Sequence, residues 1–146
     1  MRFPSAIASS GDPLVIPALN RDGDILSDLV LPLFGSIAGS ESLLVAFGDD
    51  YVPNALMAEA AHGTAPALEG KDVANPMAMI LAGAALLSHA EDEGAQTGGR
   101  AIREACLEAV ADGLRTADLG GHSGTSAFTD EVIRRTRTKL DVWASL

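Results

Sequence analysis

The chain has 146 residues, of which 47% are hydrophobic and 4% aromatic, and its formal net charge is −10. A chain of this length is expected to fold as about one domain, so residues 1–146 are treated as a single domain. The acidic balance argues against nucleic acid and anionic membranes as partners, because both are bound by clustered cations. The lone Cys106 cannot form an internal disulfide, and the longest apolar run falls short of the ~20 residues that span a bilayer. We expect a soluble, cytoplasmic protein with no membrane and no nucleic-acid partner.

The first half of the chain alternates between strand and helix signals. Residues 12–19 form a short apolar run between turn-forming clusters, which predicts a buried strand. A helix is expected from about Asp24, and Pro32 should end or kink it because proline lacks a backbone donor. Residues 43–47 are a second strand candidate, while residues 54–61 fit either a strand or a helix, since Ala and Met favour the helix.

The second half is predicted to be helical. Asn75 and Pro76 are the expected start of a helix that is apolar nearly all round and therefore buried on most of its surface. Glycines at 94, 98 and 99 should interrupt the pattern before an amphipathic helix that stops at Gly113. Thr129 is expected to cap a last helix with acids in its first turn. Strands followed by helices of this kind predict an α/β fold.

Two aspartates offer the first candidate site. Asp24 and Asp28 are four residues apart, so in a helix their carboxylates lie on one face and can share a divalent cation such as Mg²⁺ or Mn²⁺. The alternative is a solvated helix start, because acids are favoured in a first turn anyway. Asp22 adds a third acid, but the glycine after it is misplaced for a calcium-binding loop.

His62 begins the second candidate site, a loop rich in Gly, Ala and Pro. A lone histidine in such a loop can be a hydrogen-bonded structural residue. The small residues also expose backbone N–H groups, so the loop can instead cradle an anion or a nucleotide. The sequence contains neither G-x-G-x-x-G after a strand nor a G-x-x-x-x-G-K-[ST] phosphate loop.

Four motifs follow one another in a fixed order. They are G-D-I-L-S-D at 23–28, H-G-T-A-P at 62–66 with G-K and N-P behind it, T-A-D-L-G-G at 116–121 and F-T-D-E-V-I at 128–133. With them the sequence resembles the isocitrate and 3-isopropylmalate dehydrogenase family, which oxidises and decarboxylates 2-hydroxy acids with a metal ion and NAD(P)⁺. The resemblance implies a partial, three-layer-like isopropylmalate dehydrogenase fold: the C-terminal half of the cofactor-binding domain, with helices packed on a mixed sheet.

The resemblance also implies two sets of site residues. Asp24 and Asp28 match the carboxylates that hold Mg²⁺ or Mn²⁺ against the substrate. The adenosine half of NAD, or of NADP, is expected to be bound by Glu59, His62, Gly63, Thr64, Ala65, Leu68 and Asn75. Ala67 and Leu68 depart from the family, which places a ribose-binding acid or a 2′-phosphate-binding pair there, so neither cofactor is specified.

The chain matches only the C-terminal portion of the much longer family members. The family's substrate arginines, catalytic lysine and tyrosine and a further metal-binding aspartate have no counterpart in these 146 residues. One interpretation is a dehydrogenase part that needs a complementary chain and forms a homo- or hetero-oligomer. The alternatives are a noncatalytic nucleotide-binding, regulatory or assembly subunit, and a small metal-dependent enzyme without hydride transfer. The sequence assigns no catalytic residue.

Overall fold

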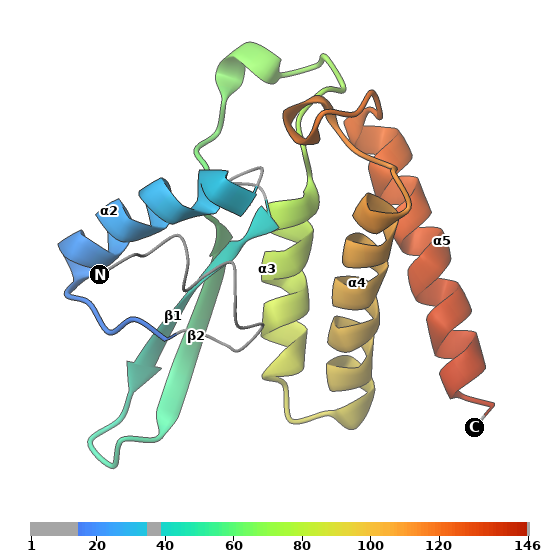
Figure 1. The fold of residues 1–146 in the computed structure, drawn as a ribbon. Helices are drawn as coiled ribbons and strands as arrows, with labels where there is room; N and C mark the ends of the chain where they lie inside the picture. Colours follow the sequence, from blue (N-terminus) through green and yellow to red (C-terminus); the bar gives the residue numbers. More distant parts are fainter. Residues whose placement is uncertain (1–14, 35–38, 146) are drawn as a thin grey trace.

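One β-hairpin and several helices lie side by side in the structure, a computed structural model that describes residues 15–34 and 39–145. In chain order the elements are α2 (Asn20–Val30), η1 (Leu31–Phe34), β1 (Glu41–Phe47), β2 (Pro53–Ala60), η3 (Pro66–Leu68), α3 (Met77–Ser88), α4 (Glu93–Ala111), η4 (Ala117–Leu119) and α5 (Thr125–Trp143). Helix α3 contacts both strands and α4, and α4 contacts α5, so these elements form a row (Figure 1). The predicted α/β class, with helices packed on a sheet, is confirmed.

The sheet differs from the expected mixed sheet. In the described ranges it consists of β1 and β2 alone, paired antiparallel. Residues 15–19, the described part of the strand expected over 12–19, form no strand, and residues 12–14 lie outside the described ranges. Pro17 lacks a backbone donor, and Val15 remains 85% exposed, so nothing in the described structure supplies the burial that its apolar pattern predicts.

The ambiguous segment at 54–61 is a strand. Its residues pair with β1, for example Leu56 with Val45 and Ala58 with Leu43. This ladder overrides the helical preference of Ala and Met, because strand preference depends mostly on cross-strand packing. Pro53 begins β2 beside a register shift in β1, a position where the missing N–H breaks no regular pairing.

Helix α2 begins at Asn20, four residues before the expected start at Asp24, and ends at Val30 as Pro32 predicts. None of its residues is buried, and Ile25 and Leu29 are 52% and 66% exposed. An amphipathic helix without a buried face still lacks part of its packing.

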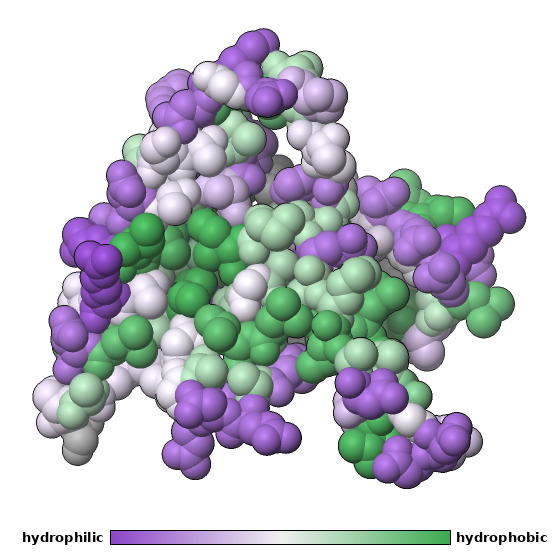
Figure 2. Space-filling view, turned by 180° about the vertical axis from the view of Figure 1, so that it is seen from behind, coloured by the Kyte–Doolittle hydropathy of each residue, from purple (hydrophilic) through white to green (hydrophobic). Residues whose placement is uncertain are grey.

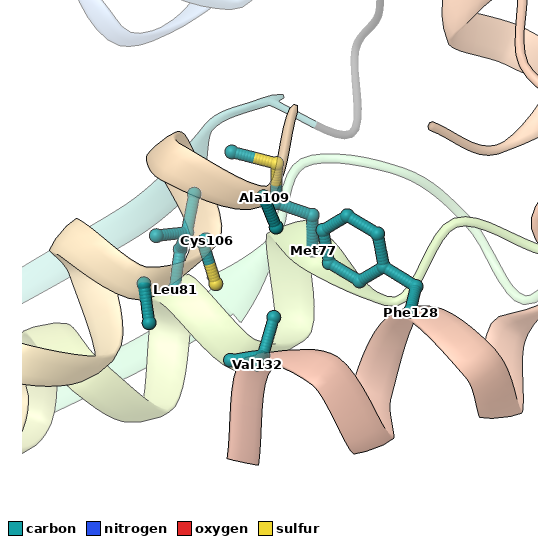
Figure 3. Packing of buried hydrophobic residues seen from close by; sticks show 7 residues of the cluster. Met77, Leu81, Cys106, Ala109, Phe128 and Val132 are labelled. Carbon is teal, nitrogen blue, oxygen red and sulfur yellow. The ribbon is translucent and has the colours of Figure 1, made fainter. Parts of the chain in front are cut away.

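The main core forms where α3, α4 and α5 meet. Figure 3 shows their side chains pointing toward one another. The buried members of this cluster are Met77, Leu81, Ala105, Cys106, Ala109, Phe128 and Val132. The amphipathic face predicted for α4 is therefore confirmed. Helix α3 is buried on one face but not nearly all round, because Met79 and Leu86 are 58% and 41% exposed. No helix in the described ranges is both long and apolar enough to cross a membrane.

The glycines of α4 do not interrupt it. The helix starts at Glu93, where the side chain of Asp92 accepts a hydrogen bond from the Ala95 N–H at 2.7 Å. A Cβ on Gly99 would lie 2.6 Å from the carbonyl oxygen of Ala84 in α3. Gly99 thus serves close helix packing, a demand that its own sequence neighbourhood does not reveal. The stop at Gly113 is confirmed, with φ of 93° in the left-handed region.

Helix α5 begins at Thr125, four residues before the predicted cap. The Thr129 hydroxyl is inside the helix and donates to the Thr125 carbonyl oxygen at 2.8 Å. The N-terminal N–H groups are instead satisfied by Asp72, which is 54 residues away from Ser126 in the chain. The capping pattern at Thr129 therefore predicted the wrong start for α5, because the residue that accepts from its first N–H groups belongs to a distant loop.

Charged side chains join the outer sides of α4 and α5. Lys139 Nζ lies 2.6 Å from Glu108 Oε1, and Arg135 Nη1 lies 2.6 Å from Asp112 Oδ2. Arg100 stands over the ring of Trp143, 5.0 Å from its centroid. Such exposed pairs contribute little stability, so the buried cluster, rather than this surface, holds α5 in place.

Two glycine substitutions test the helix packing. Gly99→Ala should lower the free energy of unfolding by about 1–3 kcal/mol, because the new methyl group meets the backbone of α3. Gly98→Ala is the matched control, since its Cβ would meet nothing within 4 Å. It should raise stability by about 0.5–1 kcal/mol through helix propensity. Urea unfolding curves measure both values, and equal effects of the two variants would contradict the proposed contact.

The thiol of Cys106 should be unreactive in the folded protein. Burial raises its pKa to about 11, so the thiolate is scarce at pH 8.5. Iodoacetamide at that pH should modify urea-unfolded protein quickly and folded protein slowly, as measured by intact mass. Equal rates in the two states would show that the α3–α4–α5 core opens readily.

Candidate functional site

The loop between β2 and α3 borders a cavity of about 630 Å³ beside the start of η4. We call it the loop cavity. Its lining residues are His62, Gly63, Thr64, Ala65, Leu68, Val73, Ala74, Asn75, Ala117 and Asp118. Small and apolar side chains predominate, with a few polar groups among them, which is the usual composition of a site for an organic ligand. Among the described residues, no lysine or arginine lines this cavity.

One wall of the loop cavity, residues 62–68, is held by local bonds. His62 Nδ1 lies 2.9 Å from the Gly63 carbonyl oxygen. Because a carbonyl oxygen only accepts, Nδ1 carries the proton in this arrangement, and Nε2 of the neutral ring is left as an acceptor. Ala65 adopts a left-handed backbone with φ of 42°, and its carbonyl oxygen accepts from the Leu68 N–H at 2.9 Å. Strained backbone of this kind often occurs at ligand sites.

The other wall, residues 73–75, is tied to distant parts of the chain. Asn75 Oδ1 accepts from the Met77 N–H at 3.0 Å, the first N–H of α3, although the cap residue is Pro76 and not Asn75 as predicted. Its Nδ2 donates to Asp118 Oδ2 at 2.9 Å, and the buried Thr116 hydroxyl donates to Asp118 Oδ1 at 2.5 Å. The Thr125 hydroxyl donates to the Ala74 carbonyl oxygen at 2.5 Å. These bonds hold the Asn75 side chain, which lines the cavity, in one orientation before any ligand arrives.

A second cavity of about 350 Å³ lies between α2 and the hairpin. We call it the acidic cavity. It is lined by Asp24, Ser27, Asp28, Ser42, Glu59, Ala60, Ala61 and His62. Both predicted metal ligands therefore line one cavity, and His62 lines both cavities. Carboxylate and hydroxyl oxygens are suitable donors for Mg²⁺ or Mn²⁺. In the described part of the chain, however, no three His, Cys, Asp or Glu side chains are placed to hold one ion.

The structure brings most of the predicted cofactor residues together. Six of the seven line the loop cavity, whereas Glu59 lines the acidic cavity with the two aspartates. Sequence reasoning missed Val73, Ala74, Ala117 and Asp118 as lining residues. The motif T-A-D-L-G-G was noticed, but spacing alone could not show that Asp118 lies against Asn75, 43 residues earlier.

A short hairpin and a row of helices packed on one side of it make up a fold that is similar to part of a solved dehydrogenase. The crystal structure of the apo β-decarboxylating dehydrogenase from Thermococcus kodakarensis matches this chain with a TM-score of 0.73 and 32% identity. The match covers 94% of this chain and 38% of that one.

Sequence comparison gives the family. The isocitrate/isopropylmalate dehydrogenase model matches residues 7–132. The alpha subunit of mitochondrial NAD isocitrate dehydrogenase from Rattus norvegicus is 39% identical over 88% of this chain and 33% of its own length. Catalytic subunit 5 of the Arabidopsis thaliana enzyme is 42% identical over 83% of this chain and 30% of its own length. The chain belongs to the isocitrate/isopropylmalate dehydrogenase family and spans about a third of the length of these curated relatives.

The role of Asn75 in holding the cavity wall can be measured. Asn75→Ala removes both the acceptor of the Met77 N–H and the bond to Asp118, so it should lower the free energy of unfolding by about 1–2 kcal/mol. Lys71→Ala, on the exposed part of the same loop, should change stability by less than about 0.5 kcal/mol. Urea titration distinguishes the two, and an unaffected Asn75→Ala would show that its two bonds contribute nothing net.

Proposed function

We propose that this chain supplies the adenosine half of an NAD⁺ site and two metal-binding carboxylates to a decarboxylating 2-hydroxy-acid dehydrogenase. The observation that carries the proposal is the gathering of His62, Leu68 and Asn75 around one cavity, next to a second cavity that contains Asp24 and Asp28. Because His62 lines both, the nucleotide and the metal would each bind next to this residue.

The loop cavity suits an adenosine group. Leu68, Val73 and Ala74 provide apolar contacts for a flat base, and the Asn75 amide provides hydrogen-bonding atoms at a fixed orientation. With Asp118 in the lining and no lysine or arginine among its described residues, the part of the cavity that the structure describes provides no charge partner for a 2′-phosphate. We therefore propose NAD⁺ rather than NADP⁺. Leu68 provides no acid for the ribose hydroxyls, so the affinity should be modest.

In the acidic cavity, Asp24 and Asp28 would hold Mg²⁺ or Mn²⁺. A divalent metal ion bound there would act as a Lewis acid that stabilises negative charge on the substrate. The remaining ligands and the proton-transferring groups would come from residues outside those described. Glu59, which lines this cavity, adds negative charge that favours a cation.

A complementary chain fits the surfaces that the described structure leaves uncovered. On the hairpin, Leu44 and Met57 pair across the strands but remain 54% and 49% exposed. Figure 2 shows apolar side chains in a band across the middle of the molecular face that it presents. Uncovered apolar surface and unpaired strand edges favour association. We propose an oligomer in which a partner chain completes the site.

A noncatalytic nucleotide-binding or assembly subunit is the second candidate. The apolar Leu68 at the ribose position favours it, because a weak hold on the cofactor is sufficient for a subunit that does not turn over. Copurification separates the two candidates: a partner chain that restores NADH formation supports the dehydrogenase. Nucleotide binding without turnover in every combination supports the subunit.

Calorimetric titration of the purified chain tests the proposed sites. NAD⁺ should bind more tightly than NADP⁺, and His62→Ala should weaken NAD⁺ binding by about tenfold through the loss of one polar contact with the ligand. Asp24→Asn should weaken Mn²⁺ binding while leaving NAD⁺ binding nearly unchanged. Glu69→Ala, outside both cavities, is the control and should change neither. Tighter binding of NADP⁺, or no binding of either nucleotide, would refute the proposed cofactor site.

A further inference from the structure

Asp72 is not among the residues that line the loop cavity, yet it joins the cavity wall to the start of α5. Its carboxylate Oδ1 accepts from both the N–H and the hydroxyl of Ser126, each at 2.8 Å. Its backbone carbonyl oxygen accepts from the Thr125 N–H at 3.1 Å. One residue therefore satisfies three donors at the first turn of a 19-residue helix.

The backbone conformation of Asp72, its close packing against Gly124 and its charge all favour this contact. Its backbone is left-handed, with φ of 54°, a conformation that aspartate tolerates better than most residues. A Cβ on Gly124 would lie 2.4 Å from Asp72 Oδ2, so only glycine lets α5 approach this closely. The Ser126 N–H and then its hydroxyl lower the pKa of Asp72, which keeps the carboxylate charged against the positive end of the helix.

We infer that Asp72 is a positioning residue for the nucleotide site, because it fixes the wall formed by residues 73–75. These three residues follow Asp72 directly and all line the loop cavity. Helix α5 is itself anchored by Phe128, which is fully buried in the core. The bond from Asp72 to Ser126 therefore transmits the rigidity of the core to the wall. The inference rests on the proposed nucleotide binding.

The opposite wall of the loop cavity, residues 62–68, is held differently. Within the described part of the chain, the hydrogen bonds of residues 62–71 stay inside that segment, such as Leu68 N–H to Ala65 O at 2.9 Å and Lys71 N–H to Leu68 O at 3.2 Å. A ligand entering the cavity thus meets one wall held to the core and one held only by its own turns. Binding costs less ordering entropy on the first wall. Loosening that wall should weaken binding even though no lining residue changes.

The test compares variants of Asp72 by NAD⁺ calorimetry at a temperature where all are folded. Asp72→Ala and Asp72→Gly both remove the carboxylate, and only the alanine adds strain in the left-handed backbone. Both should weaken NAD⁺ binding by about tenfold. Asp72→Asn keeps an oxygen acceptor for Ser126 and tolerates the same backbone, so its affinity should stay within about threefold of the unsubstituted chain.

Two controls separate positioning from general stability. Val132→Ala removes buried volume from α5 and lowers stability, but should leave NAD⁺ affinity unchanged. Asp130→Ala removes an exposed charge from the same helix and should also leave it unchanged. If Val132→Ala weakens binding as much as Asp72→Ala does, or if Asp72→Ala does not weaken it, the inference is wrong.

Hydrogen exchange gives a reading that needs no nucleotide. In the ligand-free Asp72→Ala protein, the amide of Met77, which donates to Asn75 in the wall, and that of Ser126 should exchange faster, while those of α4 stay protected. Unchanged exchange at these amides would overturn the positioning role itself. Faster exchange together with no NAD⁺ binding to the unsubstituted chain would instead refute the proposed function, and with it the assignment of the wall to a nucleotide.

Discussion

The close packing of α3 against α4 is the contact on which the wall of the loop cavity depends. Helix α3 touches both strands of the hairpin and α4, and the absence of a side chain at Gly99 lets the two helices approach until a Cβ there would lie 2.6 Å from Ala84 O. Asn75 is bonded to the first N–H of α3, and His62 lies two residues after the end of β2. The position of α3 relative to β2 therefore decides how far apart these two residues lie. The loop between them closes over the space that this spacing leaves.

The C-terminal third of the chain supports that loop from outside. Asp118 holds the Asn75 amide, Asp72 is held by the start of α5, and Phe128 anchors α5 in the core. The cavity wall is thus connected to buried apolar packing through a few polar bonds whose partners lie 43 to 54 residues apart in sequence. Packing provides the free energy, and the polar bonds provide the geometry, because directional bonds contribute little net stability but tolerate few alternative arrangements.

The described hairpin and α2 contrast with this well-packed half. Ile25, Leu29 and Leu44 are each more than half exposed, whereas Leu81 and Phe128 are almost fully buried. Exposed apolar side chains on α2 and the hairpin, in a chain that spans about a third of its curated relatives, support the proposed partner chain. The acidic cavity lies between α2 and the hairpin. The proposed partner chain would supply the metal ligands that the described residues of this chain do not provide.

The sequence by itself determined the α/β class, the family and the ordered motifs that contain His62, Asn75 and the aspartate pair, because these depend on residue types at short spacings. It also predicted that α2 ends shortly before Pro32 and α4 shortly before Gly113, because the backbone of a single proline or glycine is enough to end a helix. Only the tertiary structure decided that 53–60 is a strand, that α4 runs through its glycines and that α5 starts at Thr125. In each of these cases the deciding partner, β1, Ala84 or Asp72, is distant in the chain, so no local pattern could contain the physical cause.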